Sequence, residues 1–246
     1  MLSKSPGFLS PDRRCLTGNT LKCVGIVTMT IDHLAAVVLK GFVNSHIGLF
    51  SEKQLADLDL LYQYMRHIGR TAFPLFVFLL VEGFFHTKDR KGYGLRLLLF
   101  AILSEIPYNL AVYGRISYPK TQNTLFLLFL GLVLMAAAER IRGRWVFVRF
   151  LLFVAGGGLA YLLGLDYTYK GIALVGIFYF FYGYRMAAAL GGFCVFLSSP
   201  WSFPAFLMIP FYNGRRGRRR MGWLYLFYPV HLLVLYGILQ LSLCIF

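Results

Sequence analysis

Residues 28–39 read "TMTIDHLAAVVL" and place two adjacent ionisable side chains, Asp32 and His33, inside an apolar run. Neighbouring positions on a helix are about 100° apart, so the two side chains diverge and a polar cavity is the simplest environment for both. Lys22 lies eleven residues before His33, which is about 16 Å along a helix and within about 20° of the same azimuth. One helix therefore carries a cation near its start and an imidazole deeper on the same stripe, as suits a long ligand with an anionic end.

Imidazole is well matched to proton transfer near neutral pH, because its reference pKa is about 6.5. A neutral His33 would take a proton from an incoming amine or hydroxyl as a general base, which typically contributes about 10²–10⁴-fold to a rate. Asp32 is not expected to orient His33, since neighbouring helix positions diverge. We expect Asp32 to pair with Arg70 or to hold the ammonium group of a substrate.

Further ionisable groups lie in or at the ends of apolar segments, where a charge costs at least about 2.5–3.5 kcal/mol without a partner or a wet cavity. Glu82 and His86 are four residues apart, so a mutual pair explains them as well as a site does. His231 is equally compatible with an interhelical hydrogen bond. Glu105 precedes Pro107, which frees a carbonyl group and favours a polar cavity. The candidate chamber comprises Arg70, Glu82, Glu105, Asn109 and His231.

These residues belong to a chain that is too apolar for an ordinary soluble domain. Its 246 residues are 58% hydrophobic and only 14% charged, and several windows approach the roughly 20 apolar residues that cross a bilayer. The composition predicts an all-α, polytopic transmembrane helical bundle. Nine segments are expected, at 21–43, 68–85, 95–112, 125–138, 147–165, 171–184, 186–197, 201–212 and 224–245.

The distribution of Lys and Arg predicts the orientation. A nine-span arrangement with a cytosolic N-terminus places most of the 25 basic residues on the cytosolic side, as the positive-inside rule requires. Merging 186–197 with 201–212 would put "RRGRRR" outside, so these are interpreted as two short or half-spanning helices that line a cavity. We expect a cytosolic tail over 1–18 and one transmembrane domain over 19–246.

The net charge of +15 is explained mainly by this topology rather than by nucleic-acid binding, because the basic residues lie in loops between spans. Cytosolic Arg and Lys clusters also suit lipid headgroups or a phosphate-bearing cosubstrate. The four cysteines show no metal or disulfide spacing, so no metal is predicted. The chain contains no phosphate-binding loop, dinucleotide fingerprint or nucleophile elbow, which places any chemistry in the membrane.

Several blocks resemble the TraX family of bacterial membrane proteins, across nearly the whole chain after Leu16. They are "LTGNTLKCVGIVTMTIDHLAAV", "RHIGRTAFPLFVFLLVEGFFHTKDRKGYGLRLLLFAILSEIPYNLA", "QNTLFLLFLGL", "MIPFYNGRRG" and "YLFYPVHLLVLY". The spacing from Lys22 to His33 also resembles the basic-x10-His pattern of the membrane acyltransferase three family. The resemblance implies an integral protein of the bacterial inner membrane that transfers acetyl from cytosolic acetyl-CoA, as in acetylation of the N-terminal amine of pilin.

On this resemblance, basic residues at the cytosolic side would hold the phosphates of acetyl-CoA, the pantetheine arm would follow the stripe on the first helix, and His33 would act as base. An acyl-histidine intermediate is an alternative. The acceptor would be a peptide amine, a sugar or a lipid headgroup. The residues expected to hold the phosphates are Lys22, Arg90, Lys91 and Arg96.

A proton-coupled transporter or flippase would use the same intramembrane Asp, Glu and His residues as a proton relay. That alternative does not explain the stripe from Lys22 to His33. The sequence also shows no internal repeat, although such repeats are common in transporters. An inert membrane scaffold is disfavoured by the number of costly polar positions.

Overall fold

The computed structural model describes residues 15–141, 145–217 and 221–245, and the regular elements in this part of the chain are helices joined by turns and loops, with two isolated bridges. The all-α prediction is confirmed. The expected tail over 1–18 falls largely outside the described residues. The helices are α1 (Gly18–His33), α2 (Lys40–Ser45), α3 (Glu52–Gly69), α4 (Ala72–His86), α5 (Arg90–Tyr113), α6 (Thr124–Arg140), α7 (Val146–Leu162), α8 (Thr168–Phe180), α9 (Arg185–Val195), α10 (Phe203–Met208) and α11 (Leu224–Ile245).

Four helical segments of the described chain are long and apolar enough to cross a membrane, which fits a membrane protein. Three shorter apolar helices, α7, α8 and α9, follow in the second half. Large apolar side chains are exposed along the outward faces of α5, α7 and α11, as expected where lipid is the solvent. The four long segments are Gly18–Ser45, Glu52–His86, Arg90–Tyr113 and Leu224–Ile245.

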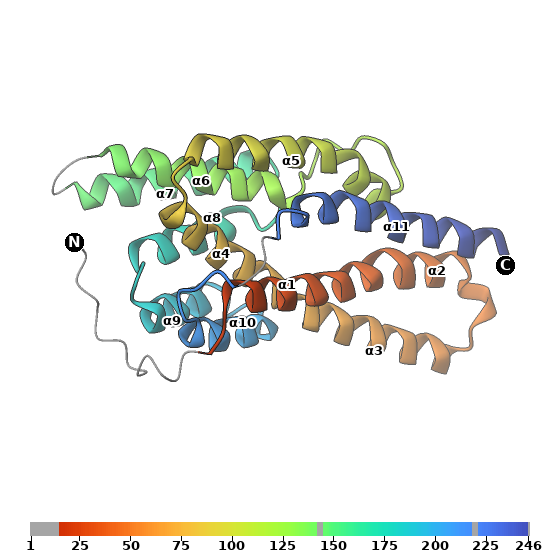
Figure 1. Cartoon of the computed structure of the whole chain (residues 1–246). Helices are drawn as coiled ribbons and strands as arrows, with labels where there is room; N and C mark the ends of the chain where they lie inside the picture. Colours follow the sequence, from red (N-terminus) through yellow and green to blue (C-terminus); the bar gives the residue numbers. More distant parts are fainter. Residues whose placement is uncertain (1–14, 142–144, 218–220, 246) are drawn as a thin grey trace.

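The first long segment carries the candidate base. Thr17 caps α1 by accepting a hydrogen bond from the backbone N–H of Thr20. The α-helix ends at His33, and a π-helical stretch, Leu34–Leu39, leads directly into α2. π-Helical turns within α-helices are frequent at functional sites. In Figure 1, α1 and α2 run through the middle of the bundle, with α3 on one side and α11 on the other.

Helix α3 is not predicted by the sequence analysis, because its segment is rich in charged and polar residues and resembles a connection between spans. Ser51 and Gln54 form a reciprocal capping box that starts it. The helix folds back along α1 and continues through a break at Arg70 and Thr71 into α4. This fold-back brings the C-terminal end of α3 against the middle of the first long segment.

Residues 185–212 form two separate short elements, as the charge pattern favours. Helix α9 ends at Val195, and α10 is a single short helix flanked by the 3₁₀ turns Pro200–Ser202 and Ile209–Phe211. Proline supplies no backbone N–H, and three prolines in this stretch, Pro200, Pro204 and Pro210, keep it from joining into one long helix. Both elements pack against the bundle, α9 on α8 and α10 on α4.

Candidate functional site

A cavity of about 600 Å³ runs along α1 and is the structural counterpart of the predicted stripe. Lys22 lines one end and His33 lines a point deeper along the same helix. Its walls come from α1, α3, α4, α5, α6 and α11 and from the loops before α8 and α11. The volume lies within the range of about 300–1,000 Å³ that is typical of ligand sites.

The Lys22 end of the cavity is cationic. Arg96 of α5 and Arg216 of the loop before α11 line the cavity with Lys22, and Lys22 and Arg216 are close enough to repel each other electrostatically. The loop is held there because the backbone N–H groups of Gly18 and Asn19 donate to the carbonyls of Arg215 and Arg216, at 2.8 and 2.9 Å. An anionic ligand would relieve this repulsion.

The deep end contains a buried ion pair that differs from the predicted one. Asp32 accepts a hydrogen bond from Nη1 of Arg66 at 2.6 Å, so the expected pairing with Arg70 is wrong. Arg70 follows Arg66 by one helical turn and acts on Asp32 only as a neighbouring charge. Gly69 makes the approach of α3 feasible, because a Cβ atom there would collide with the Asp32 side chain.

A second carboxylate, Asp166, also lines the deep end and was not predicted. It lies in the loop between α7 and α8 and accepts hydrogen bonds from Oγ1 of Thr124 at 2.5 Å and from the backbone N–H of Tyr167 at 3.0 Å. Burial raises the pKa of this carboxyl group, while these two hydrogen bonds and Arg70 act in the opposite direction. Asp166 and Arg70 thus add a second carboxyl group and a second guanidinium group near Asp32 and Arg66.

His33 contacts a second histidine from the far end of the chain. Its Nδ1 atom lies 2.7 Å from Nε2 of His231 on α11. His231 is 7% exposed, and its own Nδ1 atom lies 3.0 Å from the carbonyl oxygen of Phe227. His33 lines the cavity, whereas His231 supports it from behind. The interhelical hydrogen bond considered for His231 is therefore present, and its partner is the candidate base itself.

Glu82 and His86 form the local contact expected from their spacing, and both line the cavity. Nδ1 of His86 donates to the backbone carbonyl of Glu82 at 2.8 Å and lies 3.6 Å from the Glu82 carboxylate. The groups that act electrostatically on Glu82 are Arg185 and His86, and His33 is not among them.

Glu105 and Asn109 lie outside the cavity and hold α5 to the start of α6. Glu105 accepts hydrogen bonds from the side-chain amides of Asn123, at 2.6 Å, and Asn109, at 3.2 Å. Asn123 is the N-cap of α6 and also donates to the carbonyl of Ala101 at 2.8 Å. This arrangement explains Glu105 as a structural group.

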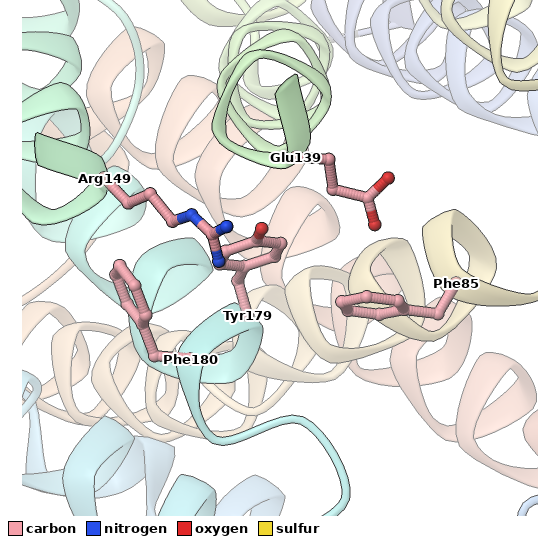
Figure 2. Close-up of a pocket in the computed structure, with 5 residues that line it drawn as sticks. All are labelled: Phe85, Glu139, Arg149, Tyr179 and Phe180. Atoms are coloured by element: carbon pink, nitrogen blue, oxygen red, sulfur yellow. The ribbon is translucent and has the colours of Figure 1, made fainter. Parts of the chain in front are cut away.

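Arg90 and Lys91 are also outside the cavity. Lys91 is exposed, and Arg90 forms an ion pair with Glu139 while packing on the Phe84 ring. Glu139 belongs to a separate pocket of about 440 Å³. Figure 2 shows Glu139 and Phe85 on one side of that pocket and Arg149 with Phe180 on the other. Of the four predicted phosphate ligands, Lys22 and Arg96 line the cavity.

Three charged residues that line the cavity were not among the predicted site residues: Arg66, Asp166 and Arg216. The sequence could have indicated Arg66, because Arg66 precedes Arg70 by four residues and lies on the same face of a helix. Arg216 lies within the quoted block "MIPFYNGRRG", whose basic residues were attributed to topology. Among the described residues, no group of three or more His, Cys, Asp or Glu side chains is arranged to hold a metal ion.

Comparison with known proteins gives this geometry a context. A family model described as "TraX protein" matches residues 17–239. The chain belongs to the TraX family. This TraX-family chain is 29% identical over 248 residues to a protein of Dichelobacter nodosus named "Probable fimbrial assembly protein FimC, serogroup H1", and the match covers 87% of this chain and 92% of the relative. No solved structure matches it.

Proposed function

We propose that this TraX-family protein is a membrane acyltransferase that moves acetyl from cytosolic acetyl-CoA to an amine or hydroxyl acceptor. One observation carries the proposal: a single cavity connects the cationic end at Lys22, Arg96 and Arg216 with the imidazole of His33. The separation of Lys22 and His33 along α1 is about 16 Å. That length suits a donor with phosphates at one end and a thioester at the other.

The chain's own residues divide the task. Lys22, Arg96 and Arg216 would bind phosphate groups, since Arg and Lys donors make charge-assisted hydrogen bonds to phosphate oxygens. His33 would take the proton of the acceptor as its nitrogen or oxygen bonds to the acyl carbon and the thiol leaves. Asp32, Arg66, Arg70 and Asp166 supply a polar but charge-balanced surface for the acceptor beside His33.

The proposed orientation follows from the same arrangement. The cationic end of the cavity would face the cytosol, where acetyl-CoA is available, so the N-terminus would be cytosolic. The five remaining elements, α6, α7, α8, α9 and α10, would then lie within the bilayer with the four long segments, giving nine membrane-embedded elements in the bacterial inner membrane. The family and the printed name of the Dichelobacter nodosus relative support a pilin-like peptide amine as acceptor.

The test is acyl transfer by purified protein in liposomes, with labelled acetyl-CoA and a peptide that carries a free N-terminal amine. We expect transfer by the wild type and a loss of about 10²–10⁴-fold in His33→Gln. His46→Gln is the matched control, because His46 is the C-cap residue of α2 and does not line the cavity. Wild-type activity in His33→Gln would contradict the assignment of the base.

A proton-coupled transporter is the second candidate, favoured by the two carboxyl groups and two guanidinium groups that line the deep end of the cavity. The liposome assay separates the two functions. Acyl transfer without any ion or voltage gradient supports the enzyme, whereas gradient-dependent movement of a solute without acyl transfer supports the transporter.

A further inference from the structure

His33 and His231 form a two-imidazole contact between α1 and α11. Their ring centroids are 5.0 Å apart with an interplanar angle of 18°, and Nδ1 of His33 lies 2.7 Å from Nε2 of His231. A hydrogen bond between two imidazoles contains a single proton, so one nitrogen donates and the other accepts. The direction of this bond decides which nitrogen of His33 carries a lone pair.

The other nitrogen of His231 settles the direction. Nδ1 of His231 lies 3.0 Å from the carbonyl oxygen of Phe227. A carbonyl oxygen has no proton to give, so Nδ1 of His231 is the donor, and the neutral ring then accepts at Nε2. Nδ1 of His33 must therefore donate to His231. The remaining nitrogen of His33, Nε2, has the lone pair and makes no hydrogen bond to any described residue.

The opposite direction would require His231 to carry a proton on both nitrogens. Such an imidazolium would be a buried cation on a side chain that is 7% exposed. Within the described chain, the carboxylate neighbour of His33 in sequence, Asp32, is paired with Arg66, and no carboxylate forms a salt bridge with His231. An uncompensated buried charge is costly, so the neutral pair is the stable arrangement.

Packing holds the His231 ring in this orientation. The Phe227 ring lies nearly parallel to it, at an interplanar angle of 3° and a centroid distance of 4.9 Å. Tyr228, which lines the cavity, approaches His33 edge-on with a centroid distance of 6.3 Å. His231 itself is not in the cavity lining, so its role is exerted through His33.

We propose that His231 is a positioning residue that holds His33 in the Nδ1–H tautomer and leaves the Nε2 lone pair for the substrate. The proposal rests on the acyltransferase function. Nε2 of His33 takes the acceptor's proton as the new bond to the acyl carbon forms and the carbon–sulfur bond breaks, and the proton then passes to the departing thiolate. While His33 is an imidazolium, its bond to His231 becomes charge-assisted and stabilises it.

The first test is independent of acyl transfer. Nitrogen NMR of protein labelled with ¹⁵N-histidine reports the tautomer of each of the five histidines, and spectra of His33→Gln and His231→Phe assign the two signals. We expect both His33 and His231 to be Nδ1–H tautomers in the wild type. An Nε2–H tautomer at His33 in the wild type would overturn the proposal, whatever the enzyme assay shows.

The second test measures transfer by two variants at position 231. Phenylalanine keeps the packing on Phe227 but accepts no hydrogen bond, whereas the amide oxygen of glutamine restores an acceptor. We expect His231→Phe to lower kcat by about 10- to 100-fold with KM for acetyl-CoA changed less than about twofold, and His231→Gln to recover most of that loss. Equal activity of the two folded variants would contradict the positioning role. Full activity of His33→Gln would instead overturn the proposed function.

Discussion

Asp32 and Arg66 meet in an ion pair of 2.6 Å that joins α1 to α3 beside the candidate base. Their side chains are 16% and 25% exposed, so each charge depends largely on the other for solvation. The pair fixes the end of α3 against the helix that carries His33. It also removes Asp32 from any direct contact with the neighbouring imidazole, because the carboxylate is directed to α3.

Removing one member of this pair should cost more than removing both charges. We expect Arg66→Gln to lower the free energy of unfolding by roughly 3 kcal/mol, because it leaves a partly buried carboxylate without its partner. The double variant Arg66→Gln with Asp32→Asn should be more stable than Arg66→Gln alone. Denaturant unfolding of the purified variants in one detergent measures the double-mutant cycle. Additive losses would show that the pair contributes no coupling.

Gly69 should tolerate no side chain. An alanine Cβ there would meet the Asp32 side chain, so Gly69→Ala must shift α3 away from α1, at a cost of about 1–3 kcal/mol. Gly158 on α7 is the matched helical control, because no atom lies within 4 Å of the position that a Cβ would take there. Gly158→Ala should leave the unfolding temperature unchanged or raised. Equal effects of the two substitutions would argue against the close helix contact.

The cationic end of the cavity should act on donor binding rather than on chemistry. We expect Lys22→Gln and Arg216→Gln each to raise KM for acetyl-CoA by about tenfold, with a smaller change in kcat. The effect should disappear with a short acetyl thioester that lacks phosphate groups. Lys88→Gln is the control, because Lys88 is exposed and does not line the cavity. An equal loss with both donors would place these residues elsewhere in the mechanism.

Two native cysteines can test the proposed orientation. Cys15 and Cys244 are both exposed and lie just before α1 and near the end of α11. In a background of Cys23→Ser and Cys194→Ser, a membrane-impermeant maleimide should label Cys244 in right-side-out vesicles and Cys15 in inside-out vesicles. The reverse pattern would mean that the cationic end of the cavity faces the outside of the cell, where acetyl-CoA is absent.

Much of the helical architecture followed from the sequence because long apolar runs have few alternatives in a membrane. The segments predicted at 21–43, 95–112 and 224–245 all lie in helices that are long enough to span. Helix α3 was missed for the converse reason, since Glu52, Lys53, Asp57 and Asp59 make it resemble a solvated loop. Hydropathy detects the cost of exposure to lipid, and it carries little information about a polar helix.

The candidate site was predictable along one helix and unpredictable between helices. The stripe from Lys22 to His33 follows from helical geometry alone, and both residues line one cavity. The partners of Asp32 and His33 come from α3 and α11, and His231 is 198 positions away from His33 along the chain. Such contacts depend on how helices pack, so Arg66 replaced Arg70 as the partner of Asp32. Arg90 likewise forms an ion pair with Glu139 and does not line the cavity.

The π-helical stretch after His33 makes the number of residues in this segment a determinant of how α1 and α2 align with α11. Residues Leu34–Leu39 complete their turns with i→i+5 spacing, so they cover the same angle with more residues than an α-helix needs. Loss of one residue there would allow an ordinary α-helix. A helix shortened in this way would keep the face that Gly41 presents to Leu239 of α11 in place, whereas an α-helix formed by all the present residues would rotate that face by about 100°. The alignment of the two helices that carry His33 and His231 is thus encoded by a count of residues as well as by their identities.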